Sequence, residues 1–428
     1  MSPEVGEELT VYLHDMQIGV VERRGPKRYR FRYNDEVRSR HETGAIVLSV
    51  SLPVREDEFP PAAARPFFDG LLPEGVVRSS LAHSLKASEE DGFALLKALG
   101  ADCAGAVAVL PKGESPQTGE GEIRPLSRTD LARLIEELPE HPLGIDGRAT
   151  GIRLSLGGIQ EKLVLVRSPN GEYGQPLDGA PSTCILKPEH ERYPEIVANE
   201  AFGLRLAGSA GLDAARAEPT DIDGRPCLHV ERFDRTIVGG GRIARVHQED
   251  MCQALGIVPV DKYEASGGPS IAAIVQLLRD TGSPRAAVDI LKVIEAALLN
   301  FLIGNSDAHG KNLALLYDPT GGVRLAPLYD LVSTQVYEGS EPALAMRIGS
   351  VEDPERVEMD AWRELGKTAG IGAQLPALIA EQTERILRCA DALVATGKAE
   401  GWHRPVVDRI FALMQERARQ LGHRARSS

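Results

Sequence analysis

The sequence predicts an α+β protein with more than one domain, and three observations support this prediction. The chain has 428 residues, whereas a single domain holds roughly 150. β-Branched and aromatic residues mark strands near the N-terminus, and strands alternate with helices from about position 150 to 238. After position 270 the apolar residues recur with the period of a helix. We therefore expect a β-rich beginning and a mostly helical end.

The first 110 residues are expected to form an α+β subdomain. LTVYLHDMQIGVVE (9–22) predicts a strand, a turn at Asp15 and a second strand. YRFRY (29–33) alternates aromatic residues with Arg, which favours a sheet with one solvated face, and AIVLSVSLP (45–53) predicts a further strand. Apolar residues at helical spacing between 89 and 100 predict a helix. Residues 111–126 are rich in Pro, Gly, Glu and Ser, lack an apolar period and are expected to be a linker.

The rest of the chain predicts two further regions, at 127–270 and 271–428. The first opens with a helix capped by Ser127 in the pattern Ser127-x-x-Asp130 and then becomes rich in strands. The second holds a buried helix through 290–302 that ends at Gly304. Two more helices are expected at about 375–395 and 404–421. This order predicts a β-rich lobe followed by a helical lobe.

Composition is that of an ordinary globular protein and argues against nucleic-acid binding by the chain alone. Hydrophobic residues make up 42% of the chain and charged residues 26%, which is enough apolar material for a core. The formal net charge is −13. Nucleic-acid binding rests on clustered Lys and Arg that neutralise phosphates, so an acidic balance disfavours it.

Cysteine usage and the pattern of apolar segments predict a cytoplasmic protein. The cysteines are scattered and odd in number, and they form no CxxC pair and have no histidines at zinc-ligand spacing. No apolar run approaches the roughly 18 residues of a membrane span, and the N-terminal MSPEVGEELT has no signal-peptide core. Reduced thiols, no membrane insertion and no secretion are therefore expected. The cysteines are Cys103, Cys184, Cys227, Cys252 and Cys389.

The residues that predict chemistry begin in GNSDAHGKN (304–312), a polar loop directly after the buried helix. Asp307 and Asn312 have the spacing D-x-x-x-x-N, which in protein kinases supplies a base for the attacking hydroxyl and an amide oxygen for magnesium. Asp330, in APLYDLVS, can be a second magnesium ligand. A single Asp in such a loop is most often a capping or turn residue. The combination with upstream residues is what predicts phosphoryl transfer.

Upstream, Lys187 ends the apolar run TCILK, where it can project from a strand toward phosphates. Glu200 lies in a helical stretch at a distance that suits an ion pair with Lys187, although a surface glutamate there is equally compatible. SLGGIQEKLVLV (155–166) places two glycines before a strand, so backbone N–H groups can approach phosphate, but a hairpin would need the same pair. The order of these parts is that of a kinase and predicts a protein-kinase-like bilobal fold.

These residues also carry a resemblance to a known family. The segments SLGGIQEK, ILKPE, VERFDR (230–235), HQEDMCQALG (247–256), KYEASGGPSI (262–271), DAHGKN and YDLVS resemble the HipA family in sequence and order. The N-terminal LTVYLHDMQIGVVE, FFDGLLPEG (67–75) and DCAGAVAVL resemble that family's N-terminal subdomain. The resemblance spans nearly the whole chain.

The resemblance implies an ATP- and Mg²⁺-dependent serine/threonine kinase that acts as the toxin of a toxin–antitoxin pair. It implies a serine of a translation factor as the target, typically in an aminoacyl-tRNA synthetase. It also implies restraint by a small helix-turn-helix antitoxin of HipB type, through which operator DNA is mainly contacted.

The resemblance also implies roles for single residues. Asp307 would be the catalytic aspartate, Asn312 and Asp330 the metal ligands, and Glu200 the ion-pair partner of Lys187. Autophosphorylation of Ser155 would place a phosphate beside the nucleotide phosphates and lower activity. Residues implied at the nucleotide are Gly157, Gly158, Ile159, Gln160, Glu161, Lys162, Lys187, Glu231, Arg232, Phe233, His309, Gly310, Lys311, Asn312, Tyr329 and Asp330.

The chain departs from ordinary protein kinases around the catalytic aspartate. His309 stands two positions after Asp307, where those kinases have a lysine, and Lys311 follows two positions later. Either could meet the γ-phosphate. No HRD precedes Asp307 and no glycine of a DFG element follows Asp330 at the usual place, so an ordinary activation segment is not expected.

Two other functions remain compatible with the sequence. A small-molecule phosphotransferase would share the same metal-binding logic on a related fold, although the N-terminal sheet argues against it. A catalytically idle kinase fold could serve as a corepressor bound to an antitoxin on DNA, although the intact set of acid, amide and lysine argues that catalysis is retained.

Overall fold

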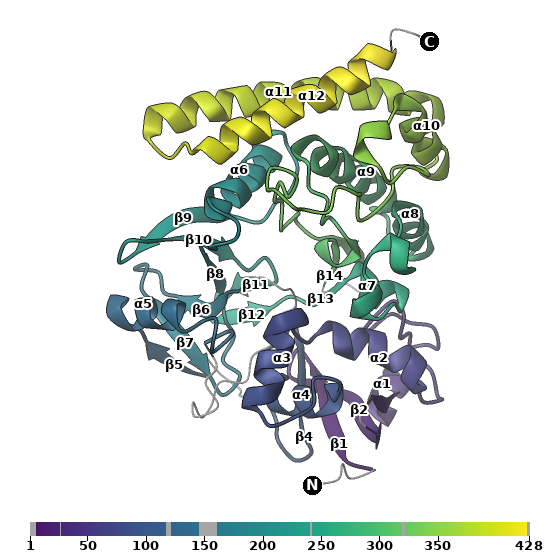
Figure 1. Ribbon diagram of the computed structural model, residues 1–428. Coiled ribbons are helices and arrows are strands. Elements are labelled where there is room, and N and C mark those ends of the chain that lie inside the picture. Colours follow the sequence, from purple (N-terminus) through teal and green to yellow (C-terminus); the bar gives the residue numbers. More distant parts are fainter. Residues whose placement is uncertain are drawn as a thin grey trace. The chain divides into compact units, whose positions relative to one another are not determined.

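The computed structural model describes residues 6–25, 27–116, 121–144, 161–239, 242–318 and 322–425. The chain divides into two compact units. The first unit comprises Met1–Pro188, Thr220–Val260 and Leu315–Gly322, and the second comprises Glu189–Pro219, Asp261–Ala314 and Val323–Ser428. The first holds most of the strands and the second most of the long helices (Figure 1). This mixture confirms the predicted α+β class.

The first unit opens with a four-stranded antiparallel sheet in the order β3-β2-β1-β4, formed by β1 (Glu8–Leu13), β2 (Met16–Gly25), β3 (Arg28–Tyr33) and β4 (Val107–Pro111). The turn after β1 is the predicted one, and His14 and Asp15 adopt positive φ there. On β3 the aromatic residues are buried, while Arg30 and Arg32 are not, which confirms the expected alternation. The helices that accompany this sheet are α1 (Asp35–Arg40), α2 (Pro61–Gly70), α3 (Gly75–Ser84) and α4 (Gly92–Leu99).

The prediction of a strand at 45–53 is wrong, because this segment forms only an isolated bridge between Ser49 and Leu52. Several of its polar groups bind residues of the 249–253 segment rather than a neighbouring strand. The carboxylate of Glu249 accepts hydrogen bonds from the Ser49 hydroxyl at 2.5 Å and from the Val50 amide at 2.9 Å. The Ser51 hydroxyl donates to the carbonyl of Gln253 at 2.7 Å.

A six-stranded sheet forms the second part of the first unit, in the order β5-β7-β6-β8-β10-β9. Its central strands β6 and β8 are antiparallel, with Leu163 opposite Leu186. Helix α5 (Arg128–Glu136) begins at Ser127, whose hydroxyl accepts from the Asp130 amide at 3.1 Å, as expected for this cap. The strands are β5 (Glu122–Pro125), β6 (Leu163–Arg167), β7 (Tyr173–Leu177), β8 (Cys184–Pro188), β9 (Ala217–Ile222) and β10 (Arg225–Glu231).

Short elements complete the first unit: β11 (Arg235–Ile237), β12 (Ile243–Arg245), β13 (Gln248–Asp250), α7 (Met251–Leu255) and β14 (Ala314–Tyr317), which belongs to this unit from Leu315 on. Helix α7 has a full capping box, because Asp250 and Gln253 each bind the backbone N–H of the other at 2.9 Å. The Gln253 amide also donates to the carbonyl of Phe67 at 2.9 Å, so α7 is fixed to α2.

The second unit is built mainly from helices: α6 (Ile196–Ser209), α8 (Ile271–Asp280), α9 (Ala286–Ile303), α10 (Met359–Thr368), α11 (Leu375–Glu400) and α12 (Pro405–Ala425). It also holds the short strand β15 (Val323–Leu325) and the 3₁₀ turns η3 (Glu264–Ser266) and η4 (Gly310–Asn312). Helices α11 and α12 lie side by side (Figure 1). α9, α11 and α12 confirm the helices predicted at 290–302, 375–395 and 404–421.

Candidate active site

The candidate active site is organised by the end of α9. This helix is largely buried and ends at Gly304, which adopts φ +73°, a conformation that favours glycine. A Cβ at this position would lie 2.4 Å from the Leu413 side chain of α12. The Gly304 carbonyl accepts from the amides of Thr334 and Gln335 at 3.0 and 3.1 Å. The loop that follows is therefore fixed at its first residue.

Asn305 links the segment that contains Asp307 to the segment that contains Asp330. Its side-chain amide donates to the Asn300 side chain at 2.9 Å and to the main-chain carbonyl of Asp330 at 3.2 Å. Its side-chain oxygen accepts from the Asp307 amide at 3.1 Å. One carboxamide thus links α9, the backbone of Asp307 and the backbone of Asp330.

Asp307 and Asn312 lie at the two ends of a tight turn. The Asn312 side chain donates to the Asp307 carbonyl at 3.0 Å, and the His309 amide donates to the same carbonyl at 2.8 Å. The Asp307 side chain is half exposed, and one of its carboxylate oxygens accepts from the hydroxyl of Tyr263 at 2.6 Å. An acid that is partly open to solvent and oriented by a donor has the placement of a general base.

Asp330 adopts φ +53°, which is uncommon for a residue other than glycine. Such a conformation costs about 1–3 kcal/mol and persists only where the surroundings enforce it. Here the Asp330 carbonyl accepts from Asn305 and, at 3.1 Å, from the Val332 amide. Enforced backbone strain of this kind is frequent at functional sites.

A small pocket of the second unit brings four of the predicted residues together. Asp330, Asn312, His309 and Tyr329 all line it. The Tyr329 hydroxyl donates to the Lys311 carbonyl at 2.6 Å, so the two predicted segments are joined a second time. His309 is buried, and its ring nitrogen lies 4.0 Å from the Asp307 carboxylate. Lys311 is also buried.

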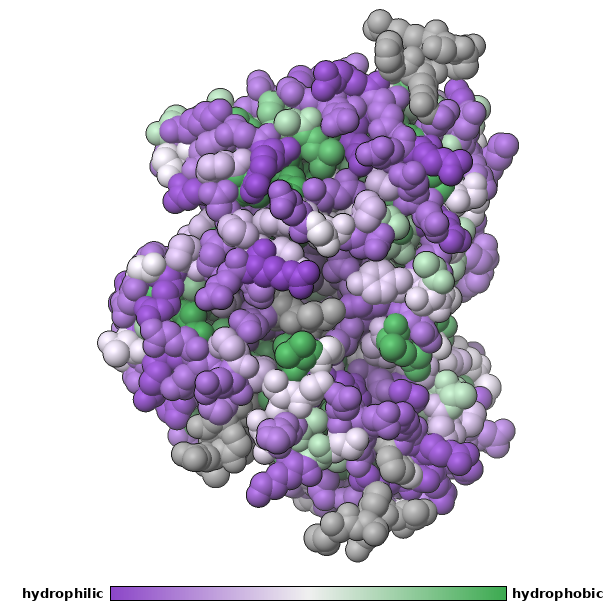
Figure 2. Space-filling view, viewed as in Figure 1, coloured by the Kyte–Doolittle hydropathy of each residue, from purple (hydrophilic) through white to green (hydrophobic). Residues whose placement is uncertain are grey.

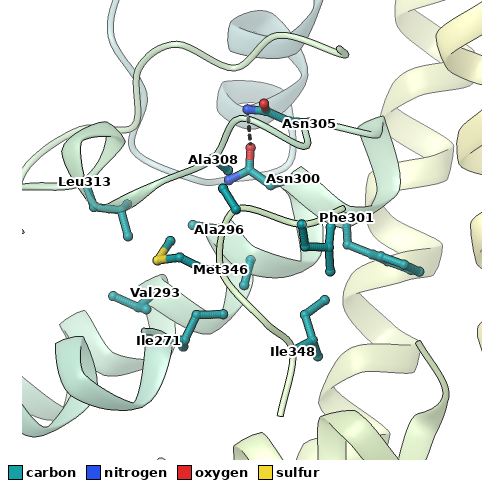
Figure 3. A pocket seen from close by; sticks show the side chains of 13 residues that line it. Ile271, Val293, Ala296, Asn300, Phe301, Asn305, Ala308, Leu313, Met346 and Ile348 are labelled. Carbon is teal, nitrogen blue, oxygen red and sulfur yellow. Dashed lines mark hydrogen bonds between the residues drawn. The ribbon is translucent and has the colours of Figure 1, made fainter. Parts of the chain in front are cut away.

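An adjoining apolar cavity of about 30 Å³ lies behind the loop. Figure 3 shows Val293, Ile271, Leu313 and Met346 around it, and the Asn300–Asn305 hydrogen bond beside it. A cavity of this volume has room for a water molecule. The two cavities share five lining residues, so the polar pocket directly adjoins the apolar cavity. The shared residues are Asn300, Asn305, Ala308, Leu313 and Met346.

Other predicted residues lie in the first unit. Lys187 is buried at the end of β8, opposite Leu228 of β10. Lys162 is buried and Glu161 half-buried, directly before β6. Glu231 ends β10 and is exposed, and Phe233 is half-buried. Glu200 is buried in α6 of the second unit, so its pairing with Lys187, a residue of the first unit, stays a prediction.

Arg232 belongs to a buried ion network of the first unit. It donates to Asp234 at 2.7 Å, to the Ser182 hydroxyl at 2.8 Å and to the Cys103 carbonyl at 3.0 Å. Arg235 donates to Asp102 at 2.9 Å. Burial alone would raise the pKa of Asp102 and Asp234, but Coulombic attraction to these arginines lowers the pKa of both. A nucleotide role for Arg232 stays a prediction.

The segment that contains Ser155, Gly157, Gly158, Ile159 and Gln160 lies outside the described residues. The predictions for its phosphate contacts and for autophosphorylation therefore have no structural description.

The fit of a magnesium nucleotide can be judged from the donor set. Among the described residues, no group of three or more His, Cys, Asp and Glu side chains is placed to hold a metal ion. Magnesium at kinase sites takes only one or two carboxylates from the protein and the rest of its ligands from phosphates and water. Asp330 and Asn312 in one pocket fit that smaller requirement.

The surface gives no sign of a membrane segment within the described part of the chain. None of its helices is long and apolar enough to cross a bilayer. Figure 2 shows a mainly hydrophilic face on which hydrophobic residues form small separate patches. Scattered hydrophobic side chains of this kind are normal on globular proteins.

Sequence reasoning missed Asn305 and Tyr263 as members of the site. Asn305 lies two positions before Asp307 in the loop, and Tyr263 lies in KYEASGGPSI. Asn305 belongs to the polar loop at 304–312 and Tyr263 to a family-like segment, but the sequence assigns neither of them a role. Neither spacing nor composition indicates that the Tyr263 hydroxyl meets a carboxylate 44 positions away.

Comparisons with known proteins agree over most of the chain. Residues 154–394 match the model of the HipA-like C-terminal domain, and residues 9–110 match that of the HipA N-terminal domain. The serine/threonine-protein kinase toxin HipA of Shewanella oneidensis is 35% identical over 342 residues, which is 76% of each chain. Sinorhizobium fredii Y4mE, whose name calls it a kinase provisionally, is 44% identical over 334 residues, 77% of this chain and 78% of its own.

A solved structure of the Shewanella oneidensis HipA, HipB and operator DNA complex is also similar. It matches with a TM-score of 0.80 and 28% identity over 97% of both chains. This match supports the predicted α+β, kinase-like fold class, and the two domain matches agree with the family resemblance seen in the sequence. The chain belongs to the HipA family.

Proposed function

We propose that the chain is an ATP-dependent protein serine/threonine kinase that acts as a cytoplasmic toxin of a toxin–antitoxin pair. The observation that carries the proposal is the joining of the Asp307 and Asp330 segments through Asn305, with Asn312 in the same pocket as Asp330. A phosphoryl-transfer site needs this set, because a base must face the acceptor hydroxyl while oxygen ligands hold magnesium.

In the proposed reaction, Asp307 accepts the proton of a serine hydroxyl. The serine oxygen forms a bond to the γ-phosphorus, the bond from that phosphorus to the β,γ-bridging oxygen breaks, and ADP leaves. Asn312 and Asp330 would hold Mg²⁺, which neutralises phosphate charge when bound. Asn305 keeps the two segments in register, so base and metal ligands stay at a fixed separation.

The remaining predicted residues would bind the nucleotide. Lys187, supported by Glu200, would face the phosphates, and either His309 or Lys311 would meet the γ-phosphate. Glu231, Arg232, Phe233 and Tyr329 would line the rest of the site. The backbone from Gly157 to Lys162 would cover the phosphates, and phosphorylation of Ser155 beside it would repel them and lower activity.

The partners are proposed from the solved complex of the relative. That complex contains HipB and operator DNA, and we propose that this chain likewise binds a small antitoxin of HipB type. The net charge of −13 supports contact with DNA mainly through the antitoxin. A serine of an aminoacyl-tRNA synthetase is the proposed target.

The proposal is tested with γ-labelled ATP and a bacterial lysate, using the wild type, Asp307→Ala and Asp330→Ala. Label is expected in protein with the wild type and to be lost at least a hundred-fold in either variant, with unchanged thermal unfolding midpoints. Asp360→Asn, which removes an exposed acid of α10, serves as the matched control and should keep full transfer.

Three outcomes would contradict the proposal. Label confined to small metabolites would favour a small-molecule phosphotransferase. Full transfer by Asp307→Ala would remove the catalytic role of that residue. Absence of any transfer by a folded wild type that binds an antitoxin would favour a catalytically idle corepressor.

A further inference from the structure

We propose that Tyr263 is a positioning residue for Asp307, and this inference rests on the proposed kinase function. Its hydroxyl donates to one carboxylate oxygen of Asp307 at 2.6 Å. A hydrogen bond of this length from a neutral hydroxyl to a carboxylate is of the strong, charge-assisted class. Tyr263 would hold the carboxylate in one orientation and leave its second oxygen to the acceptor hydroxyl.

The Asp307 side chain needs such a partner because it is half exposed. A carboxylate with solvent on one side can adopt several rotamers, and each rotamer other than the productive one lowers the rate. The ring of His309 lies 4.0 Å from the other carboxylate oxygen, beyond hydrogen-bond distance. The Tyr263 hydroxyl, at 2.6 Å, is thus within hydrogen-bond distance and can fix the orientation of the carboxylate.

Tyr263 is itself held firmly. Its carbonyl accepts from the amides of Ser266 and Gly268, both at 2.9 Å, which closes a tight turn around η3. Gly268 is required there, since an added Cβ would lie 2.3 Å from the Asp261 carbonyl. The next residue, Glu264, donates its amide to the Ala345 carbonyl at 3.0 Å and accepts from the Arg347 amide at 2.7 Å.

The turn around η3 also packs against the loop at 304–312. The Tyr263 ring meets the His309 ring edge-on with centroids 5.3 Å apart. The side chain of Pro269 fills the space beside Gly310, where a Cβ would come within 2.4 Å. The phenol is therefore placed by backbone and ring contacts that do not depend on its hydroxyl, so removal of the hydroxyl should leave the ring in place.

A second role for the same contact is that of a phosphate acceptor, since the hydroxyl sits where an acceptor hydroxyl would meet the base. The rigid turn argues against this role, because an acceptor must be replaceable by the protein substrate. In the positioning role the phenol keeps its proton throughout, and the proton of the substrate serine passes to Asp307. The two roles differ in whether residue 263 becomes phosphorylated.

The experiment measures phosphate transfer to lysate protein by full-length wild type, Tyr263→Phe and Asp307→Ala, with binding of Mg·AMP-PNP and thermal unfolding recorded for each. We expect Tyr263→Phe to lower kcat about ten- to a hundred-fold. The KM for ATP and the Kd for Mg·AMP-PNP should change by less than about two-fold, and the unfolding midpoint by less than about 2 °C. Tyr12→Phe is the matched control, because it removes a tyrosine hydroxyl that donates to the Glu114 carbonyl at 2.8 Å, and it should transfer normally.

The outcomes separate this inference from the proposed function. If Asp307→Ala abolishes transfer but Tyr263→Phe keeps the wild-type kcat, the positioning role is overturned and the proposed function stands. Phosphotyrosine at position 263 in the wild type, found by tandem mass spectrometry, would replace it with the acceptor role. Transfer that does not depend on Asp307 would overturn the proposed function itself.

Discussion

Burial raises the pKa of the Glu249 carboxyl to about 7. The side chain lies inside the first unit, where it accepts from the Ser49 hydroxyl, the Val50 amide and the Tyr317 hydroxyl. These donors favour the charged form, but the loss of hydration outweighs them. Nearby, burial lowers the pKa of His247 to about 4, so that ring stays neutral above pH 5.

A carboxyl whose pKa is raised by folding binds more protons in the folded than in the unfolded state. Its contribution to stability is therefore complete below its unfolded value, near 4.5, and is lost as the pH rises through about 7. A single buried group of this kind can change the free energy of unfolding by up to about 3 kcal/mol over that window.

Glu249→Gln should remove this pH dependence, since an amide does not ionise. Relative to the wild type, the variant should gain up to about 3 kcal/mol between pH 5 and pH 8, measured by urea unfolding at both pH values. Glu136→Gln, which removes an exposed carboxylate on α5, is the control and should leave the difference unchanged. A parallel pH profile for wild type and Glu249→Gln would contradict the prediction.

Among the elements, the 3₁₀ turn η4 depends on one small residue. Gly310 lies against Pro269, and a Cβ would approach the proline ring to 2.4 Å, closer than non-bonded carbon atoms can lie. The Gly310 amide also points to the Lys262 carbonyl at 3.4 Å. A side chain at this position would push the turn that carries Asn312 away from the 262–269 segment.

Gly310→Ala is expected to lower phosphate transfer at least ten-fold because the turn must shift by a fraction of an ångström or more. Label incorporation and the thermal unfolding midpoint together check this. Gly208→Ala is the matched control, since Gly208, in the last turn of α6, has no atom within 4 Å of an added Cβ. Equal activity of the two variants would show that η4 tolerates the shift.

Two elements show which sequence patterns are enough to predict secondary structure and which are not. The apolar period of α9 and the glycine that ends it specify that helix, because one broad face is buried whatever the details of its neighbours. The segment 45–53 has the β-branched composition of a strand but forms none. Its partners are the Glu249 carboxylate and the Gln253 carbonyl, about 200 positions away, and strand composition carries no information about them.

At the scale of the whole molecule, a buried ion network links parts of the first unit that lie far apart in the sequence. Asp102, next to the N-terminal sheet, binds Arg235, Arg245 and the Ser182 hydroxyl, while Asp234 accepts from the Gly105 amide at 2.7 Å. The N-terminal part is thereby joined to the segment 182–245 through charges that have little access to water. Removing one member of such a network leaves its partners buried with less compensating charge.

Asp102→Asn should lower the free energy of unfolding of the first unit by about 3–5 kcal/mol, because the guanidinium groups lose a buried counter-charge. Asp360→Asn, in an exposed ion pair of α10, should change it by less than about 1 kcal/mol. Chemical denaturation of both variants checks the difference. Similar values for the two would show that the buried network contributes little net stability.

The sequence by itself determined the α+β class, the principal helices, the chemical types at the candidate site and, through its motifs, membership of the HipA family. These depend on local periodicity and on residues close together in the chain, such as Asp307 and Asn312. Only the tertiary structure decided that Asn305 joins Asp307 to Asp330, that Tyr263 meets Asp307 and that Arg232 lies in an ion network. Hydrogen bonds between distant segments depend on how the whole chain packs, and a linear pattern of residues does not encode that packing locally.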